Sequence, residues 1–426
     1  MSSILTNNGA MVALQTLKSI NSNLSTTQSE ISTGKRVASA KDNSAVWAIS
    51  KVMEADVKGF KGISDSLNLG QSTVAVARQA AETTTELLTD IKGKIVAAQE
   101  ENVDRDKIQA DINALRDQIN AVTGAAQFNG LNLLSNTDST EGTGSINVLA
   151  SLDRSSTGVA ASDINVGKQD LGTSAAAAGT MGSDVSAGNG AAVGATAVFT
   201  TFDGIGASDD IVAGASFSVS ATAFSGDDSG DAYDFNAAVV YVAREGDTFS
   251  DVMDQMVTRL NVAAAEAGLE VTFAENATTA GQIDFTNNYD EAITDGSTVE
   301  QSDNADLATM QSEADGTIGG GLEILAGFDV STDDGAEAAL VGIESLIQTS
   351  IDAAAAFGSA QGRIETQTNF VQGLTDALKS GIGTMVDADM EEASARLQAL
   401  QVQQQLGVQA LSIANQAPQQ LLSLFR

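Results

Sequence analysis

The chain has 426 residues, with 56 acidic against 21 basic side chains and a formal net charge of −35. It contains no His and no Cys, which excludes Ser-His and Cys-His nucleophiles, disulfides, and metal sites built on imidazole or thiolate. Carboxylates alone can support catalysis, but no pair is singled out among the many acids. We therefore expect neither an enzyme nor a cofactor or metal site.

The negative charge is concentrated in the middle of the chain. Residues 155–362 hold 33 acids and three basic residues (Lys168, Arg244 and Arg259), whereas the two ends together are nearly neutral. The middle is expected to be a solvated, self-repelling body, and the ends can pack against copies of themselves. Nucleic acid is not an expected partner, because phosphate binding needs clustered Lys and Arg.

The first 44 residues predict a thin amphipathic helix and then a basic loop. A sparse apolar seam runs through Ser, Thr, Asn and Gln: Leu17, Ile20, Leu24 and Ile31. A helix with so little apolar surface is marginal by itself. Gly34 can end it, and Ser39 or Asp42 can cap the next helix. On its pattern alone, the loop of residues 32–43 is either a solvated connection or a functional segment.

Two long apolar stripes predict long helices. Apolar residues recur at steps of three, four or seven over residues 49–98, and again over residues 336–385. At roughly 1.5 Å per residue the first helix is about 75 Å long, so it needs partners along its side. No apolar run approaches the roughly 18 residues that span a bilayer, and no secretory signal is visible. These features alone indicate a cytoplasmic protein.

Shorter elements follow the first long helix. A helix is expected over residues 105–122, with Asp104 or Asp106 as its cap and Gly124 as its stop. Asn129-Gly130 between apolar residues then predicts a tight hairpin near residues 128–134.

The middle of the chain is expected to form a small α+β domain of about 120 residues. Residues 172–196 are nearly all small, which predicts a linker. A helix is expected from Phe249 to Leu260, capped by Asp247 or Thr248. The strand candidates are residues 198–202, 216–224, 237–243, 269–273 and 282–286. The acidic turn at residues 227–231 lacks the spacing of a calcium loop, so we interpret it as solvated surface.

The end of the chain resembles its beginning in character. A stripe in a Gln-rich helix comprises Ala399, Val402, Leu406, Ala410 and Ile413, and Leu421, Leu422, Leu424 and Phe425 follow Pro418. The order of elements predicts an α-helical, coiled-coil core from both chain ends with an inserted β-rich α+β domain. The terminal helices either pair only with each other in a monomer or pack around an axis as a helical homopolymer. Two such helices bury too little to offset the entropy of ordering them, which favours the homopolymer.

Three stretches of the sequence resemble bacterial flagellins. They are Glu-Ile-Ser-Thr-Gly-Lys-Arg-Val at 30–37 with Ser-Ala-Lys-Asp-Asn at 39–43, Gln-Phe-Asn-Gly at 127–130, and Ala-Asn-Gln-Ala-Pro-Gln-Gln-Leu-Leu-Ser-Leu-Phe-Arg at 414–426. The resemblance covers both ends, about half of the chain. Each stretch alone would be weak, but the combination at opposite ends of a chain without His or Cys is specific.

The resemblance implies a structural subunit that self-assembles into the extracellular flagellar filament used for motility. It implies three parts: an inner-wall coiled coil (1–44 and 385–426), an outer wall with the hairpin (45–171 and 321–384), and a surface-exposed acidic insert (172–320). The inner-wall contacts would come from Leu17, Ile20, Leu24, Ile31, Val402, Leu406, Ile413, Leu421, Leu422, Leu424 and Phe425.

Two shorter segments also receive roles from the resemblance. The spoke between the walls would comprise Gly34, Lys35, Arg36, Ser39, Lys41 and Asp42, and the hairpin would comprise Phe128, Asn129 and Gly130. Arg36 and Lys41 would pair with carboxylates of adjacent subunits, although surface pairs contribute little singly.

The resemblance replaces the cytoplasmic interpretation with a secreted, extracellular one. Flagellins leave the cell unfolded through the flagellar type III export apparatus, without a cleaved signal. The implied partners are further copies of the chain, the export apparatus, a flagellin chaperone, the filament cap and hook-associated proteins, with no insertion into a membrane. The main alternative is a hook–filament junction protein, which shares the terminal pattern. Adhesion or glycosylation of the outer domain is left open.

Overall fold

The computed structural model describes residues 7–155, 158–185, 188–202, 210–226, 232–302 and 314–424. The chain divides into two compact units. The end unit comprises Met1–Asp65 and Thr368–Arg426, and the central unit comprises Ser66–Gln367. Both boundaries fall inside long helices, α2 (Ser44–Ala98) and α6 (Asp333–Val386), so each of these helices contributes to both units.

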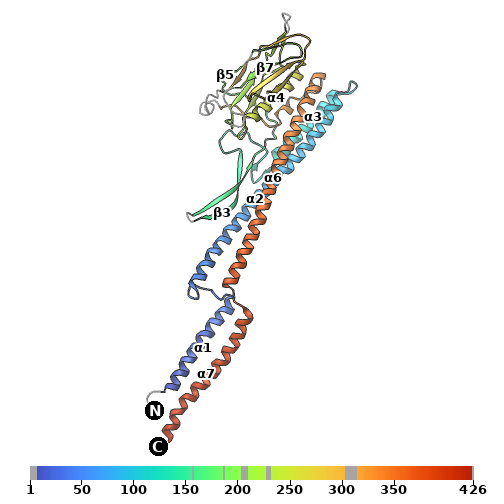
Figure 1. Cartoon of the computed structure of the whole chain (residues 1–426). Helices are drawn as coiled ribbons and strands as arrows, with labels where there is room; N and C mark the ends of the chain where they lie inside the picture. The colour runs from blue at the N-terminus through green and yellow to red at the C-terminus, as the bar shows by residue number, and fades with distance from the viewer. Residues whose placement is uncertain are drawn as a thin grey trace. The chain divides into compact units, whose positions relative to one another are not determined.

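In the end unit, α1 (Asn8–Thr33) and α7 (Met390–Leu424) lie side by side and antiparallel (Figure 1). The side chain of Asn7 caps α1 by accepting a hydrogen bond from the N–H of Ala10 at 3.0 Å. Gly34 follows the last turn in the left-handed conformation, with a φ of 66°. The prediction that Gly34 ends the first helix is therefore confirmed.

The predicted caps of the next helix are wrong. The side chain of Asn43 accepts a hydrogen bond from the N–H of Val46 at 3.1 Å, which makes Asn43 the cap of α2. Asp42 accepts instead from the N–H groups of Ala38 and Ser39, at 3.2 and 2.9 Å. Its carboxylate closes a turn within the preceding loop, so it does not point at the start of α2.

The helices of the central unit bury the later part of the stripe predicted over residues 49–98, whereas Ile49 at its start is 52% exposed. Its members between Leu67 and Ala98 are at most 1% exposed, and α6 supplies a facing set. They are Leu67, Val74, Ala77, Ala81, Leu88, Ile91, Ile95 and Ala98 in α2, with Ile343, Leu346, Phe357 and Ile364 in α6. A hydrogen bond from Thr85 to Ser350 joins the two helices at 2.9 Å.

Helix α6 has one property that the sequence pattern did not reveal. Among the described residues, it is the one helix long and apolar enough to cross a membrane by length and composition, with a mean hydropathy of 1.2 over its best window. Much of this apolar content is Ala and Gly, which do not stand out as a hydrophobic run. The core helix of a globular bundle meets the same criterion, and 33% of this window is buried within the chain. The absence of membrane insertion stays a prediction.

The third helix and the hairpin follow as expected, apart from one boundary. Asp104 caps α3 (Arg105–Ala125), accepting from the N–H of Lys107 at 3.3 Å. Gly124 does not stop this helix but lies within its last turn. Strands β1 (Gln127–Phe128) and β2 (Leu131–Asn132) then pair around Asn129 and Gly130, both at positive φ, which confirms the tight turn.

A long two-stranded hairpin, β3 (Ser145–Ser155) with β4 (Gly158–Gly167), was not predicted. It packs against the helices of the central unit through Val148. A Cβ on Gly70 of α2 would lie 2.6 Å from Val148, so the strand approaches closer than any side chain at position 70 would allow. The side chain of Gln367 in α6 donates to the carbonyl of Ala150 at 2.9 Å.

In the inserted domain, called the head below, the described residues form three antiparallel sheets and helix α4 (Phe249–Glu266). The sheets have the strand orders β10-β9-β14-β6, β11-β8-β15-β5 and β12-β13-β7. The strands are β5 (Ser183–Asp184), β6 (Gly190–Ala191), β7 (Thr196–Thr201), β8 (Ser216–Val219), β9 (Phe224–Gly226), β10 (Ala232–Tyr233), β11 (Val239–Val242), β12 (Val271–Glu275), β13 (Gln282–Asn287), β14 (Ile293–Asp295) and β15 (Val299–Gln301). Their inner faces and α4 share one core, in which Phe199 and Phe273 meet edge to face with ring centroids 4.9 Å apart.

The head confirms the predicted α+β character and corrects two of its parts. Residues 216–224 form two strands in different sheets, because the chain turns at residues 220–222. The expected linker of residues 172–196 contributes β5 and β6, which pair with β15 and β14. Thr248 caps α4 in a capping box with Asp251, as one of the two predicted caps. The predicted fold class, helices from both chain ends with a β-rich insert between them, is confirmed.

Candidate assembly surfaces

One apolar seam holds α1 and α7 together within a single chain. The predicted residues Leu17, Ile20, Leu24 and Ile31 are all half-buried and lie on the side of α1 that faces α7. A Cβ on Gly407 of α7 would lie 3.2 Å from Leu17 and 3.8 Å from Ile20, so the helices approach closely there. Asn7 donates to the carbonyl of Ala414 and Gln404 donates to Asn21, both at 2.7 Å, which fixes the register.

The residues predicted on α7 do not face α1. Val402, Leu406 and Ile413 are 56%, 58% and 68% exposed. The buried and half-buried positions of α7 form a different seven-residue pattern: Ala393, Leu397, Leu400, Gln404, Gly407, Leu411 and Ala414. Helix α7 therefore has two apolar stripes, and a single α1 covers only one of them. We call the other, Val402, Leu406 and Ile413, the open stripe.

Three exposed apolar residues on α1 were not predicted. Met11, Val12 and Leu14 are 61%, 64% and 45% exposed near the start of the helix. The sequence does contain a signal for them, since three large apolar residues within four positions cannot all share the face of Leu17 and Ile20. Exposed apolar side chains gathered on neighbouring helices are typical of surfaces that bind another protein.

The four apolar residues predicted to make contacts at the end of the chain are Leu421, Leu422, Leu424 and Phe425. The first three belong to the last turns of α7, where the structure describes the helix but not the side chains. Phe425 lies outside the described residues. The contacts expected of all four stay predictions.

The loop after α1 is tied to the segment between α6 and α7 by backbone pairing. The N–H groups of Arg36 and Val37 donate to the carbonyl of Val386 at 2.7 and 3.2 Å, and the N–H of Ala388 donates to the carbonyl of Gly34 at 3.0 Å. Lys35 and Asp387 pair across this short ladder. The loop and its partner therefore form a two-stranded connection.

The basic residues of this loop differ in the bonds that their side chains form. Arg36 donates to the carbonyl of Met385 at 3.0 Å, so part of its bonding capacity is taken up within its own chain. Lys35 lies 3.9 Å from Glu54, a weak and partly exposed ion pair. Lys41 is exposed and forms no ion pair with any described residue. Pairing of Arg36 and Lys41 with a neighbouring subunit stays a prediction, and Lys41 has the freer side chain.

The acidic residue of the loop shapes its turn. Ser39 donates to Asp42 through both its backbone N–H and its hydroxyl, and these hydrogen bonds hold the pKa of Asp42 below its usual value. The predicted cap is therefore a turn-forming residue, and its charge is engaged within the loop.

A cavity of about 390 Å³ lies beside the loop in the end unit. Its lining carries charges of both signs next to a few apolar residues and comprises Lys35, Lys58, Lys379, Glu54, Asp387, Val57, Ile382 and Gly383. Such mixed charge suits contacts with a polar protein surface.

The hairpin residues lie at the surface of the central unit. Phe128 is half-buried, and Asn129 and Gly130 are exposed. Asn132 anchors the hairpin to α3 by donating to the carbonyl of Thr123 at 2.8 Å.

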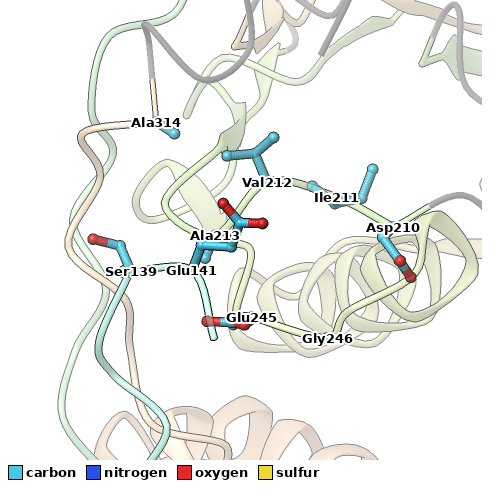
Figure 2. Close-up of a pocket in the computed structure, with 9 residues that line it drawn as sticks. All are labelled: Ser139, Glu141, Asp210, Ile211, Val212, Ala213, Glu245, Gly246 and Ala314. Atoms are coloured by element: carbon cyan, nitrogen blue, oxygen red, sulfur yellow. The ribbon is translucent and has the colours of Figure 1, made fainter. Parts of the chain in front are cut away.

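A pocket of about 540 Å³ lies at the edge of the head, but its acidic residues do not form a metal site. Figure 2 shows Glu141, Asp210 and Glu245 around it. Glu245 is already occupied by the N–H groups of Gly142 and Thr143, at 2.5 and 3.0 Å. Among the residues that the structure describes, no group of three or more acidic side chains is placed to hold a metal ion. The acidic turn at residues 227–231 lies outside the described residues.

Comparison with known proteins assigns the family. The model of the bacterial flagellin N-terminal helical region matches residues 4–139, and that of the C-terminal helical region matches residues 340–425. The chain is 35% identical to Flagellin A of Rhizobium meliloti over the full length of both proteins.

Solved structures give more distant likenesses. FliC from Burkholderia pseudomallei is 16% identical, covers 69% of this chain and 99% of its own, and has a TM-score of 0.31. FlgL from Xanthomonas campestris is 12% identical, covers 78% and 98%, and has a TM-score of 0.30. Neither likeness distinguishes a filament subunit from a junction protein, whereas the full-length relatives do. The chain belongs to the bacterial flagellins, the structural subunits of the extracellular flagellar filament.

Proposed function

We propose that copies of this flagellin join in the filament through the open stripe of α7 and the exposed apolar residues of α1. The observation that carries this proposal is the second stripe on α7, which lies away from α1 and exposes more than half of Val402, Leu406 and Ile413. Burial of apolar area contributes roughly 25 cal/mol per Å², so a neighbouring helix gains most by covering side chains of this kind. The half-buried seam residues such as Leu17 hold the hairpin of α1 and α7 together, and the open stripe holds its neighbours.

The wider architecture is proposed on the same basis. Residues 1–44 and 385–426 form the inner wall, residues 45–171 and 321–384 form the outer wall, and residues 172–320 project from the surface. The concentration of acidic side chains in residues 155–362 supports an outward position for the insert, because repulsion between copies is smallest where they are farthest apart. The short ladder between the loop after α1 and Val386 supports the role of that loop as the connection between the walls.

The partners belong to the same proposal. Before assembly, the exposed side chains of the open stripe need partners that cover them. These partners are the type III export apparatus, a chaperone that covers α7 before export, and a cap at the filament tip. A hook-associated protein would meet the open stripe at the base of the filament. The apolar exposure of Leu406 and Ile413 is what makes such protection necessary in an unassembled chain.

The test is assembly of a double variant, V402Q with L406Q. Gln keeps the helix and removes the apolar surface, so we expect the subunit to stay folded while elongation of seeded filaments falls at least about tenfold. The measurement is filament length in the electron microscope after purified subunits are added to filament fragments.

The control changes the same kind of residue outside the proposed surface. Val193 in the head is 57% exposed, and V193Q should elongate filaments as the unmodified chain does. Normal elongation by the α7 double variant would contradict the assignment of the open stripe.

A further inference from the structure

Two strands of chain connect the head to the helices, and they are paired with each other. We call residues 170–177 and 315–323 together the neck. The N–H of Ala177 donates to the carbonyl of Thr317 at 3.0 Å, and the N–H of Thr317 donates back to Ala177 at 2.9 Å. Gly320 donates to Ser174 and Leu322 donates to Gly172, both at 2.8 Å. The neck is therefore a hydrogen-bonded pair, although its composition is that of a linker.

Glycines allow the two backbones to come closer than side chains would permit. A Cβ on Gly320 would lie 2.1 Å from the carbonyl oxygen of Gly172, and one on Gly321 would lie 2.0 Å from that of Asp170. The carboxylate of Asp170 accepts from the N–H groups of Gly172 and Gly321, at 2.7 and 3.1 Å, and so bridges the two strands.

Two buried arginines of the head hold this pair. Arg244 donates through Nε and Nη2 to the carbonyl of Gly319, at 3.2 and 3.1 Å. Arg259 of α4 pairs with Glu323 at 2.9 Å, with side chains only 8% and 14% exposed. The second carboxylate oxygen of Glu323 accepts from the N–H of Ala176 at 2.6 Å, so Glu323 joins α4 to both strands of the neck.

The ring of Tyr241 packs against both guanidinium groups. Both lie near the ring of Tyr241 on β11, with the Cζ atoms of Arg244 and Arg259 at 5.4 and 5.2 Å from its centroid. The hydroxyl of Tyr241 accepts from Arg244 at 3.1 Å and donates to Asp247 at 2.5 Å. Arg244 and Arg259 thus both bond to the second strand of the neck, at Gly319 and at Glu323.

The burial of Arg244 and Arg259 is unusual in so acidic a region of the chain. Residues 155–362 contain three basic residues against 33 acids, and two of the three are buried at the neck. On the surface they would relieve repulsion at no cost in desolvation, whereas burial is costly unless each charge is paired and hydrogen-bonded. Their position indicates a specific task.

We propose that Arg244, Arg259, Tyr241 and Glu323 form a lock that makes the neck a rigid coupling between the head and the helices. The lock joins groups 64 and 75 residues apart in sequence, Arg259 with Glu323 and Arg244 with Gly319. It closes only when β11, α4 and both strands of the neck are in place. The head is then fixed to the central helices in one orientation.

The test is amide hydrogen exchange on the full-length, unassembled subunit. In the unmodified chain, the amides of Ala177, Thr317, Gly320 and Leu322 should exchange within about tenfold of the rate of the core pair β12 and β13. In R259M, Glu323 loses its partner, so neck amides should exchange at least about tenfold faster while the β12–β13 amides keep their rate. G320A should give the same pattern without removing a side chain from the head.

The matched control is K168M, which removes the third basic residue of the same region outside the lock. It changes the net charge by the same amount and should leave both sets of amides unchanged. Rapid exchange of neck amides in the unmodified chain would show a flexible linker and overturn the proposal. So would equal acceleration of neck and β12–β13 amides in R259M and G320A, or no acceleration in either. Because the subunit is unassembled, the result does not depend on the proposed filament contacts.

Discussion

A few buried polar residues of the head have pKa values that differ from their usual values. Tyr241 is 1% exposed, and burial raises the pKa of its hydroxyl, so it remains protonated and donates to Asp247. Asp295 is 4% exposed and accepts two hydrogen bonds from Ser297, but its Oδ2 has no hydrogen-bond partner among the described residues. Burial raises the pKa of Asp295, with hydrogen bonds from Ser297 and from the backbone of Gly188 opposing the effect.

Asp295→Asn should therefore stabilise the head at neutral pH. A carboxyl whose folded pKa lies above its unfolded value of 3.8 binds its proton more tightly when folded. Its cost to stability grows as pH rises above the unfolded pKa and is complete above the folded one. At pH 7.5 we expect the thermal midpoint of D295N to rise by about 2 °C. The difference should shrink as pH falls and vanish below the unfolded pKa.

The measurement is calorimetry of both proteins between pH 3.5 and 8. Asp315 serves as the control position, because hydrogen bonds from Thr180 lower the pKa of its exposed carboxyl. D315N should show the opposite sign and lose stability at neutral pH. A D295N gain that is the same at every pH would mean that charge burial is not its cause.

At the scale of elements, glycines decide which surfaces can meet. Gly70 lies inside α2, where Gly costs roughly 1 kcal/mol relative to Ala, yet a Cβ there would lie 2.6 and 2.8 Å from the two Cγ atoms of Val148. Val148 is β-branched and therefore stiff at χ1, so its side chain has little freedom to turn away. Gly93, in the same helix, lies at the surface, and a Cβ there would meet no atom within 4 Å.

The two glycines should therefore respond in opposite directions to the same substitution. G70A is expected to lose about 1–3 kcal/mol of unfolding free energy by overpacking, partly offset by helix propensity. G93A should gain up to about 1 kcal/mol. Chemical denaturation gives both values, and amide exchange of β3 and β4 reports whether the hairpin has left α2. A gain in both variants would mean that β3 does not press on α2.

The same elements show what the sequence can and cannot predict. The stripe from Leu67 to Ala98 was predictable, because a single apolar face with helical spacing is expected to pack against the core. The orientation of α7 was not, since it carries two stripes and only the partner decides which is covered. The β3–β4 hairpin was missed because its apolar residues are mixed with polar ones without strict alternation and no Asn-Gly or Asp-Gly turn signal separates the strands. Residues 172–177 of the neck were misread as part of a linker because small residues are typical both of a flexible linker and of two backbones in close contact.

At the scale of the whole molecule, the insert buries its own apolar core, whereas the two chain ends leave apolar side chains exposed. The head closes a core of its own, with Phe199, Phe217 and Phe285 at most 1% exposed. The terminal helices leave Met11, Val12, Leu406 and Ile413 largely exposed, and their shared seam is only half-buried. Isolated helices gain most of their stability from packing an apolar face. The head should therefore be stable in a single subunit, whereas α1 and α7 should become stable on assembly.

The most direct test is amide hydrogen exchange of α1 and α7 in the dilute subunit and in the assembled filament. We predict that amides of residues 8–33 and 390–416 exchange rapidly in the subunit, where β12 and β13 are already protected. In the filament, the two helices should become at least about a hundredfold more protected. Full protection of both helices in the dilute subunit would contradict this, because the exposed stripes would then not be what neighbouring copies complete.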